Sequence, residues 1–459
     1  MFFLGLDFGT SGARVAVLDE TGQLFFESRV TYADPANPQH WREALFDLIA
    51  GLPAEIRHGL SALATDGTSG TLLATDLRLE PVSPALLYSD GRAETKAAKI
   101  SKAFSPSPPP LSPQGRGEFE THLIKGVARS AGGLFSNHGA IPPNPPLSRG
   151  EQNPYGPTSG LAKRLWLAKY FPDAEFCFHQ ADWLAALLTG KPGITDYHNA
   201  LKSGYDVEAM QWPERVTALP GSHWQQTVLA PGEDIAPLSP EIAKRFKLNP
   251  SCIVRAGTTD SIAAFIASGA CRPGEAVTSL GTTLVLKLLS EKRVDDAASG
   301  VYSHRFGKLW LAGGASNSGG GVLRQFFNDE ELARFSAKID PNLSSGLDYY
   351  PLPNPGERFP VNDPKLASRL EPRPLDDAGF LHGLLEGIAR IEALGYGKLE
   401  ELGASPLTKV ITAGGGARNE TWQRIRGKLL GVPVSAATLS EASIGAARLA
   451  RLGTSLLPD

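Results

Sequence analysis

A carboxylate lies beside a turn of small polar residues near the start of the chain. Asp7 follows an apolar run, residues 2–6, and the turn at 9–12 leads into a second apolar run, residues 15–18. This pattern predicts a β-hairpin whose turn can present N–H groups and hydroxyls to phosphate, while Asp7 can hold a divalent cation. The phosphate-binding candidates are Gly9, Thr10 and Ser11. We therefore expect ATP chemistry; an ordinary hairpin is the alternative.

A second carboxylate marks the junction of a predicted strand, residues 251–256, with a predicted helix from residue 262. Phosphoryl transfer to an alcohol needs an acceptor for the hydroxyl proton. Asp260 is the candidate general base, and the small residues Gly257 and Thr258 leave room for the phosphates. The alternative is that Asp260 serves only as a helix N-cap.

Hydroxyl and carboxylate side chains cluster in residues 65–71, at the end of another predicted strand, residues 60–65. Residues 72–75 are expected to be the hairpin partner of that strand. A cluster of this kind suits a polyol and makes Asp66 and Ser69 substrate-binding candidates, against the alternative of a plain turn. Residues 88–92 could add an aromatic wall and a carboxylate–guanidinium pair to this site. The alternative is that the charged pair is only a structural ion pair.

The second half of the chain repeats the opening pattern. Residues 276–280 and 284–289 flank a Gly-Thr-Thr turn at 281–283, and two such hairpins predict two similar lobes facing each other across a nucleotide. Three glycines at 414–416 would let a flat ring lie on bare backbone, with a flexible loop as the alternative. The nucleotide-binding candidates in this half are Gly281, Thr282, Gly415 and Asn419.

The elements that must position these groups alternate between strand and helix patterns, which predicts an α/β fold. Helical spacing marks residues 41–52, 160–170 and 180–188. Residues 197–199, which include a histidine, are interpreted as a solvated or packed turn. The proline-dense stretch at about 104–157 is interpreted as an inert, disordered insertion, with a proline-rich docking ligand as the alternative.

Composition excludes several classes of function. A formal net charge of −3 without a basic stripe argues against nucleic-acid binding. No apolar run approaches the ~20 residues of a membrane-spanning helix. The three cysteines are scattered and form neither a disulfide framework nor a zinc site. A cytoplasmic protein is expected, and the absence of a P-loop or Rossmann glycine motif disfavours those ATPases and dehydrogenases.

Several segments together resemble the FGGY carbohydrate kinase family of the actin-like ATPase superfamily, in family order and over nearly the whole chain. The matching segments are residues 6–11, 159–167, 257–260, 279–282, 413–419 and 441–447. The resemblance implies two ribonuclease H-like lobes around an interdomain cleft. The expected divisions are a sugar-binding lobe at 1–267, a nucleotide-binding lobe at 268–440, and a helix at 441–459 that packs back on the first lobe.

The resemblance also implies ATP- and Mg²⁺-dependent phosphorylation of a sugar hydroxyl. Asp7 would hold magnesium and touch the sugar, and Asp260 would be the catalytic base. The residues implied to hold ATP are Gly9, Thr10, Gly281 and Thr282 at the phosphates, and Gly415 and Asn419 at adenosine. The partners expected are therefore a small sugar and ATP, with protein partners unknown.

Within the family, the chain is most similar to short pentulose kinases of cyanobacteria and plants, which act on D-ribulose. Typical xylulokinases carry a Met-His pair in the segment where this chain has Asp-Gly-Thr-Ser at 66–69. In the short group, a serine matching Ser69 binds D-ribulose together with aspartates matching Asp7 and Asp260. Three alternatives stay open: a D-xylulose or other polyol kinase, an actin- or Hsp70-like conformational ATPase, and a kinase disabled by the insertion.

Overall fold

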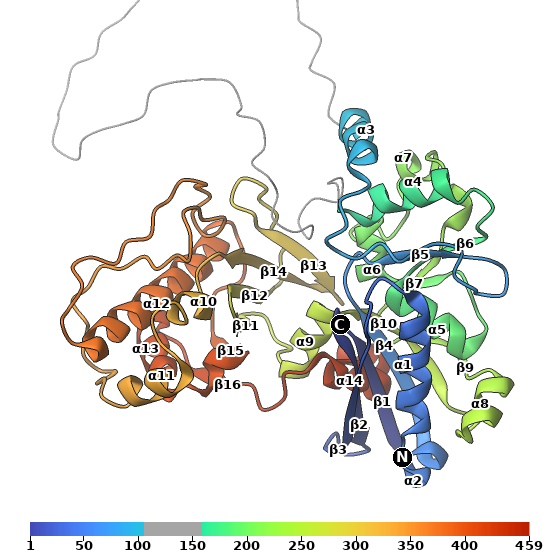
Figure 1. Ribbon diagram of the computed structural model, residues 1–459, viewed down its shortest axis with the longest axis horizontal. Helices are drawn as coiled ribbons and strands as arrows, with labels where there is room; N and C mark the ends of the chain where they lie inside the picture. Colours follow the sequence, from blue (N-terminus) through green and yellow to red (C-terminus); the bar gives the residue numbers. More distant parts are fainter. Residues whose placement is uncertain (105–157, 459) are drawn as a thin grey trace, which may run out of the picture.

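Two six-stranded sheets form the centres of two lobes that lie side by side (Figure 1). The computed structural model describes residues 1–104 and 158–458. Apart from Phe104, which ends a helix, the proline-dense stretch predicted at 104–157 lies outside the described residues. The α/β prediction with two lobes is confirmed, since each lobe combines a mixed sheet with covering helices.

The sheet of the first lobe has the strand order β3-β2-β1-β4-β10-β9. β1 pairs antiparallel with β2 and parallel with β4, and β10 pairs parallel with β4. The strands are β1 (Phe2–Phe8), β2 (Gly12–Asp19), β3 (Leu24–Thr31), β4 (Leu60–Gly67), β9 (Asp234–Pro237) and β10 (Ile253–Thr259). Because β1, β4 and β10 run in the same direction, their carboxyl ends meet at one edge of the sheet.

The sheet of the second lobe has the order β13-β14-β12-β11-β15-β16. Its strands are β11 (Glu275–Leu280), β12 (Leu284–Ser290), β13 (Tyr302–Phe306), β14 (Leu309–Ser316), β15 (Lys409–Ala413) and β16 (Val434–Ala436). From β14 to β16, neighbouring strands pair antiparallel twice and then parallel twice, as they do from β3 to β10 in the first sheet. The repeat of the opening hairpin in sequence therefore corresponds to a repeat of the sheet.

Helices cover the sheets because their apolar faces meet the apolar faces of the strands. On the first sheet, Trp41 and Leu45 of α1 pack with Leu4 and Leu6 of β1, and on the second sheet α12 packs on β12 and β14. The longer helices are α1 (Pro38–Ala50), α3 (Glu94–Phe104), α4 (Gly160–Tyr170), α5 (Gln180–Thr189), α8 (Pro240–Phe246), α9 (Asp260–Ser268), α11 (Asp329–Ser336), α12 (Asp377–Glu401), α13 (Glu420–Leu430) and α14 (Ala442–Leu452).

The remaining elements are short. They are α2 (Ala54–Gly59), α6 (Tyr197–Lys202), α7 (Glu214–Thr217), α10 (Gly320–Leu323), the 3₁₀ turns Ser222–Trp224, Gly415–Arg418 and Gly453–Leu456, and the strands β5 (Leu72–Thr75), β6 (Phe176–His179), β7 (Ile194–Asp196) and β8 (Thr227–Leu229). The helices expected at 41–52, 160–170 and 180–188 are confirmed as α1, α4 and α5. Within the described residues, no helix is both long and apolar enough to cross a bilayer.

The prediction that residues 72–75 pair with β4 was wrong. β5 pairs antiparallel with β6, about a hundred residues further along the chain. The reason is topological, because β4 already has β1 on one side and β10 on the other. No edge of β4 is left for a hairpin partner, so the turn at 68–71 must carry the chain out of the sheet.

A third apolar cluster lies between the lobes. Ile262 and Phe265 of α9 belong to it, together with Val277, Leu311 and Ile411 from the second sheet. This shared core joins the second lobe to the helix that begins at Asp260, so the position of that helix depends on both lobes.

Helix α14 returns from the second lobe and packs on β1, β4 and α9 of the first (Figure 1). Two glycines permit this contact. A Cβ on Gly5 of β1 would lie 2.0 Å from the carbonyl oxygen of Ser443, and a Cβ on Gly445 would lie 1.8 Å from that of Ala263. The backbones of β1, α14 and α9 are therefore closer together than any side chain would allow.

Candidate active site

A cavity of about 850 Å³ opens where β1, β4 and β10 end. Its lining comes from the first lobe and from the segment 440–442 before α14. The candidates brought together here from distant parts of the sequence are Asp7, Gly9, Thr10, Ser11, Ser69 and Asp260. The sheet explains this meeting, because Asp7 of β1 is the register partner of Asp66 on β4, and Asp66 that of Thr258 on β10.

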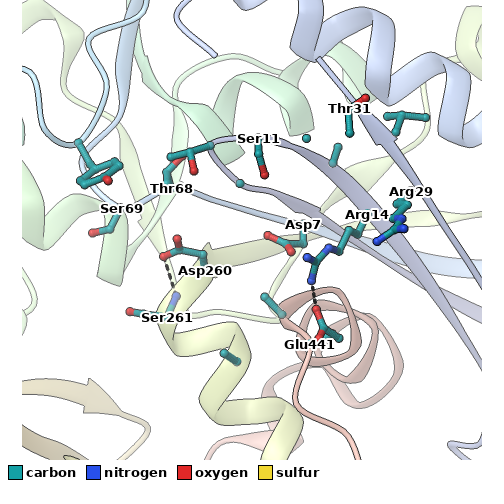
Figure 2. A pocket seen from close by; sticks show the side chains of 18 of the residues that line it. Asp7, Ser11, Arg14, Arg29, Thr31, Thr68, Ser69, Asp260, Ser261 and Glu441 are labelled. Carbon is teal, nitrogen blue, oxygen red and sulfur yellow. Dashed lines mark hydrogen bonds and ion pairs between the residues drawn. The ribbon is translucent and has the colours of Figure 1, made fainter. Parts of the chain in front are cut away.

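Asp7 is half-buried at the floor of the cavity, and its carboxyl group points toward Asp260 (Figure 2). Burial raises the pKa of Asp7 above its ordinary value, while the adjacent side chain of Asp66 and the charge of Arg14 act in the opposite direction. The turn beside it is held by a bond from the Gly9 N–H to the carbonyl of Gly12 at 3.0 Å, and by the hydroxyl of Tyr32, which donates to the carbonyl of Gly9.

Asp260 is the first residue of α9, and Thr259 rather than Asp260 occupies the N-cap position. Asp260 therefore does not serve as the N-cap of α9. Its Oδ1 accepts a hydrogen bond from the N–H of Ser261 at 2.7 Å (Figure 2), and the helix N-terminus stabilises a negative charge there. The structure thus presents an aspartate in the cavity wall, in a place suited to an ionised proton acceptor.

Asp66 lies beneath the cavity instead of in its wall. Its side chain is fully buried, and neither carboxyl oxygen has a hydrogen-bond partner within the part of the chain that the structure describes. Burial raises the pKa of Asp66 well above its ordinary value, and the charges of Asp7 and Asp260 raise it further. Burial therefore favours the protonated form of Asp66, which lies beside Asp7 on the neighbouring strand and outside the lining of this cavity.

Hydroxyl groups form one end of the cavity and guanidinium groups the other (Figure 2). Thr68 and Ser69 make the first end, in the turn after β4. The side-chain oxygen of Gln180 accepts from the N–H of Thr68 at 2.9 Å and from its hydroxyl at 2.7 Å, which fixes this turn against α5. Arg14 and Arg29 of β2 and β3 make the second end.

The nucleotide candidates of the second lobe lie outside this cavity but close to one another. Gly320 and Gly321 donate their N–H groups to the carbonyls of Gly281 and Thr282 at 2.9 and 3.0 Å. A Cβ on Gly414 would lie 2.8 Å from the carbonyl oxygen of Leu280. Two glycine loops thus flank the second hairpin closely, with their backbones directly against it.

Gly415 leaves its backbone open to a ligand, whereas the side chain of Asn419 already makes hydrogen bonds within the protein. A Cβ on Gly415 would meet nothing within 4 Å, so its backbone faces open space, as a bound ring requires. The Oδ1 of Asn419 instead accepts from the N–H of Trp422 at 2.9 Å and caps α13, and its Nδ2 donates to the hydroxyl of Ser336 at 2.8 Å. Asn419 therefore has a structural task in this conformation.

Gly257 and Thr258 are packed under the site. A Cβ on Gly257 would lie 1.6 Å from the carbonyl oxygen of Thr65, so Gly257 allows β10 to approach β4. The Thr258 hydroxyl lies 2.7 Å from Nδ1 of His198, whose Nε2 lies 2.6 Å from the carbonyl oxygen of Arg305. That carbonyl can only accept, so Nε2 carries the proton and the Thr258 hydroxyl donates to Nδ1.

His198 was predicted to lie in a solvated or packed turn, and it is fully buried in α6. Burial lowers its pKa from 6.5 to about 3. The nearest carboxylate, Asp196 at 3.7 Å, already accepts from the N–H of His198 and from Asn199. The histidine is therefore neutral and links the strand before Asp260 to β13 of the second lobe.

We expect the contribution of His198 to stability to depend on pH. At pH 7.5, His198→Gln should be less stable than the parent, because two buried hydrogen bonds are disturbed. As pH falls from 6.5 toward 3, the unfolded chain binds a proton at His198 that the folded chain does not, so the parent alone loses stability. The difference in free energy of unfolding between the two proteins, measured by urea denaturation, should narrow by on the order of 2 kcal/mol between pH 7.5 and 4.5. A constant difference contradicts this assignment.

Sequence reasoning missed Arg14, Arg29 and Glu441 as cavity residues. Arg14 is the register partner of Asp7 in the hairpin and forms an ion pair with Glu441 (Figure 2). The pairing of the two strands was a usable signal, because residues opposite each other in a tight hairpin share a face. Nothing local to Glu441 indicated that it returns to this cavity.

Comparison with known proteins identifies the wider relationship. Residues 276–453 match the C-terminal domain of the FGGY family of carbohydrate kinases. Xylulose kinase of Escherichia coli (strain K12) is 25% identical over 486 residues, which cover 98% of this chain and 90% of the relative. Residues 276–453 thus have the sequence pattern of FGGY carbohydrate kinases, and the whole chain is similar to a sugar kinase. These similarities indicate a phosphotransferase of the sugar kinase type.

A second curated relative and a solved structure extend the similarity over nearly the whole chain. Gluconokinase of Bacillus subtilis (strain 168) is 22% identical over 469 residues, covering 92% of this chain and 82% of the relative. Among solved structures, a xyloylose kinase from Brucella ovis superposes with a TM-score of 0.76 at 22% identity, covering 99% of this chain and 91% of that one. The two-lobed fold is thus that of FGGY kinases.

Proposed function

We propose that the protein transfers the γ-phosphoryl group of ATP to a terminal hydroxyl of a ketopentose, with D-ribulose as the preferred acceptor and D-ribulose 5-phosphate as the product. The observation that carries the proposal is the cavity in which the turn at 9–12, Ser69 and Asp260 meet. A phosphate-type hairpin, a hydroxyl-lined wall and a candidate base are the parts that such a reaction needs.

In this proposal Asp260 accepts the proton of the attacking hydroxyl. The sugar oxygen then forms its bond to the γ-phosphorus while the bond to the β–γ bridging oxygen breaks, and ADP leaves with that electron pair. Asp260 is suited to the role because it lies in the cavity wall at a helix N-terminus. The N–H groups of Thr10 and Ser11, in the turn beside Asp7, are proposed to hydrogen-bond phosphate oxygens.

The nucleotide is proposed to extend from the first hairpin toward the second, with Gly281 and Thr282 at phosphates and Gly415 beneath adenine. The open space over Gly415 supports the last assignment. Asn419 would reach a ribose or base only by releasing the N-terminus of α13.

Magnesium is proposed to bind at Asp7. Within residues 1–104 and 158–458, no group of three His, Cys, Asp or Glu side chains could hold a metal ion by itself. Asp7 nevertheless fits a magnesium that accompanies ATP, because Mg²⁺ commonly takes one or two carboxylates and completes its coordination with phosphate oxygens and water. When bound, the ion would neutralise charge on the phosphates.

The cavity favours an uncharged sugar over gluconate. A carboxylate substrate would gain from a cation beside its acidic end, but the lining guanidinium groups, Arg14 and Arg29, lie at the end opposite Ser69 (Figure 2). D-Ribulose and D-xylulose differ only in the configuration at C3. A hydroxyl such as that of Ser69 in the cavity wall can distinguish them, because an unmatched hydrogen bond is costly in a desolvated site.

A panel of acceptors tests this proposal. ADP release should be measured with D-ribulose, D-xylulose, gluconate and glycerol at fixed MgATP, with a no-sugar blank. We expect the highest kcat/KM for D-ribulose and a blank rate far below it. A preference for D-xylulose would overturn the acceptor assignment, while sugar-independent hydrolysis as the main activity would favour the conformational ATPase.

A further inference from the structure

Lys163 of α4 is fully buried, and the chemistry described above does not use it. Its Nζ donates to the carbonyl oxygen of Gly70 at 2.8 Å and to that of Leu87 at 2.6 Å. Burying an ammonium group costs free energy unless polar partners replace its water. These two carbonyls are such partners, so the arrangement ties two backbone segments through one side chain.

The two tied segments form the hydroxyl end of the cavity. Gly70 directly follows Ser69, and Leu87 directly precedes Tyr88; both Ser69 and Tyr88 line the cavity. The segments also touch through a short antiparallel bridge between Leu72 and Leu86, with bonds of 3.1 and 2.7 Å. Lys163 adds a second link nearer the cavity, because Gly70 and Leu87 are the neighbours of the lining residues Ser69 and Tyr88.

The link does not depend on the charge of the lysine. Burial lowers the pKa of Lys163 to about 7, although the nearby charge of Asp90 opposes this. An ammonium group has three N–H donors and a neutral amine has two, and two are enough for the carbonyls of Gly70 and Leu87. The tie can therefore persist on both sides of neutral pH.

We propose that Lys163 is a positioning residue for sugar recognition: by holding the carbonyls of Gly70 and Leu87, it sets the distance between Ser69 and Tyr88 and so the fit of the acceptor. This inference rests on the proposed function. Lys163 does not touch the substrate, and it acts through the two residues that line the cavity. Its loss should therefore affect the sugar and spare the nucleotide.

The test compares Lys163→Met with Lys169→Met in the full-length protein. Methionine preserves length and apolar packing and removes the donors, while Lys169 lies exposed on the same helix and serves as the matched control. KM and kcat should be measured for D-ribulose, D-xylulose and ATP, together with the melting temperature. We expect Lys163→Met to raise the sugar KM about tenfold and to narrow the preference between the two ketopentoses, with the KM for ATP unchanged.

Three outcomes separate the possibilities. If Lys163→Met changes sugar and ATP parameters equally, or changes neither, the positioning role is overturned. If it does not fold, Lys163→Arg carries the test: its larger head should alter the ratio of kcat/KM for the two ketopentoses at least threefold, and an unaltered ratio overturns the proposal. If the parent protein phosphorylates no sugar, the proposed function fails and this inference fails with it.

Discussion

Asp260→Asn should lower kcat for the preferred sugar by about 10²–10⁴-fold, the usual range for a lost general base. Asparagine has nearly the same shape and can still accept the hydrogen bond from the Ser261 N–H, which is 2.7 Å long in the parent. It cannot take up the hydroxyl proton. Binding of ADP, measured by calorimetry, should stay within about twofold of the parent, because the proposed phosphate and adenine contacts are untouched.

Asp329→Asn is the matched control for this experiment. Asp329 is also the first residue of a helix, α11, but it lies exposed in the second lobe. It should keep the parental kcat. If Asp260→Asn retains more than about a tenth of the parental rate, Asp260 is not the base. If both variants lose activity equally, the effect comes from the helix terminus and not from the cavity.

Gly445→Ala should produce the largest loss of stability among single-methyl changes in α14. The added Cβ would lie 1.8 Å from the carbonyl oxygen of Ala263, so α14 and α9 must move apart. Backbone displacement of this kind is costly, and we expect the melting temperature to fall by about 5–10 °C. Activity should fall at assay temperatures near the new transition, since α9 carries Asp260.

Gly397→Ala is the same substitution, but we expect it to raise the melting temperature instead of lowering it. Gly397 lies in the helix α12, and a Cβ there would meet nothing within 4 Å. Alanine has the higher helix propensity by about 1 kcal/mol, so this variant should melt slightly above the parent. Equal melting temperatures for the two variants would show that α14 does not pack on α9 as described.

The sequence predicted the two hairpins around residues 9–12 and 281–283 well, because their signals are local. Apolar runs on both sides of a glycine turn require only neighbouring residues, and the repeat at 281–283 then indicated two lobes. Helix starts were less accurate: α1 begins at Pro38, before the apolar spacing from Trp41, because Asn37 caps it and proline suits the first turn.

The candidate site was predictable where a polar residue follows a strand. Asp7, Ser69 and Asp260 were found in this way, and parallel strands brought them to one cavity. Asp66 was assigned to the same surface, because sequence alone does not show which side chain at a strand end faces inward. Lys163 gave no signal, since a lysine on a helix usually lies in solvent.

The packing of α14 has a consequence for how the protein folds. The first lobe contains the earliest strand, β1, and is not complete until α14 covers it, whereas the second sheet consists of one continuous segment from β11 to β16. The second sheet can therefore form without α14, whereas the first lobe cannot bury the α14-facing surface of β1 and β4 until this helix is in place.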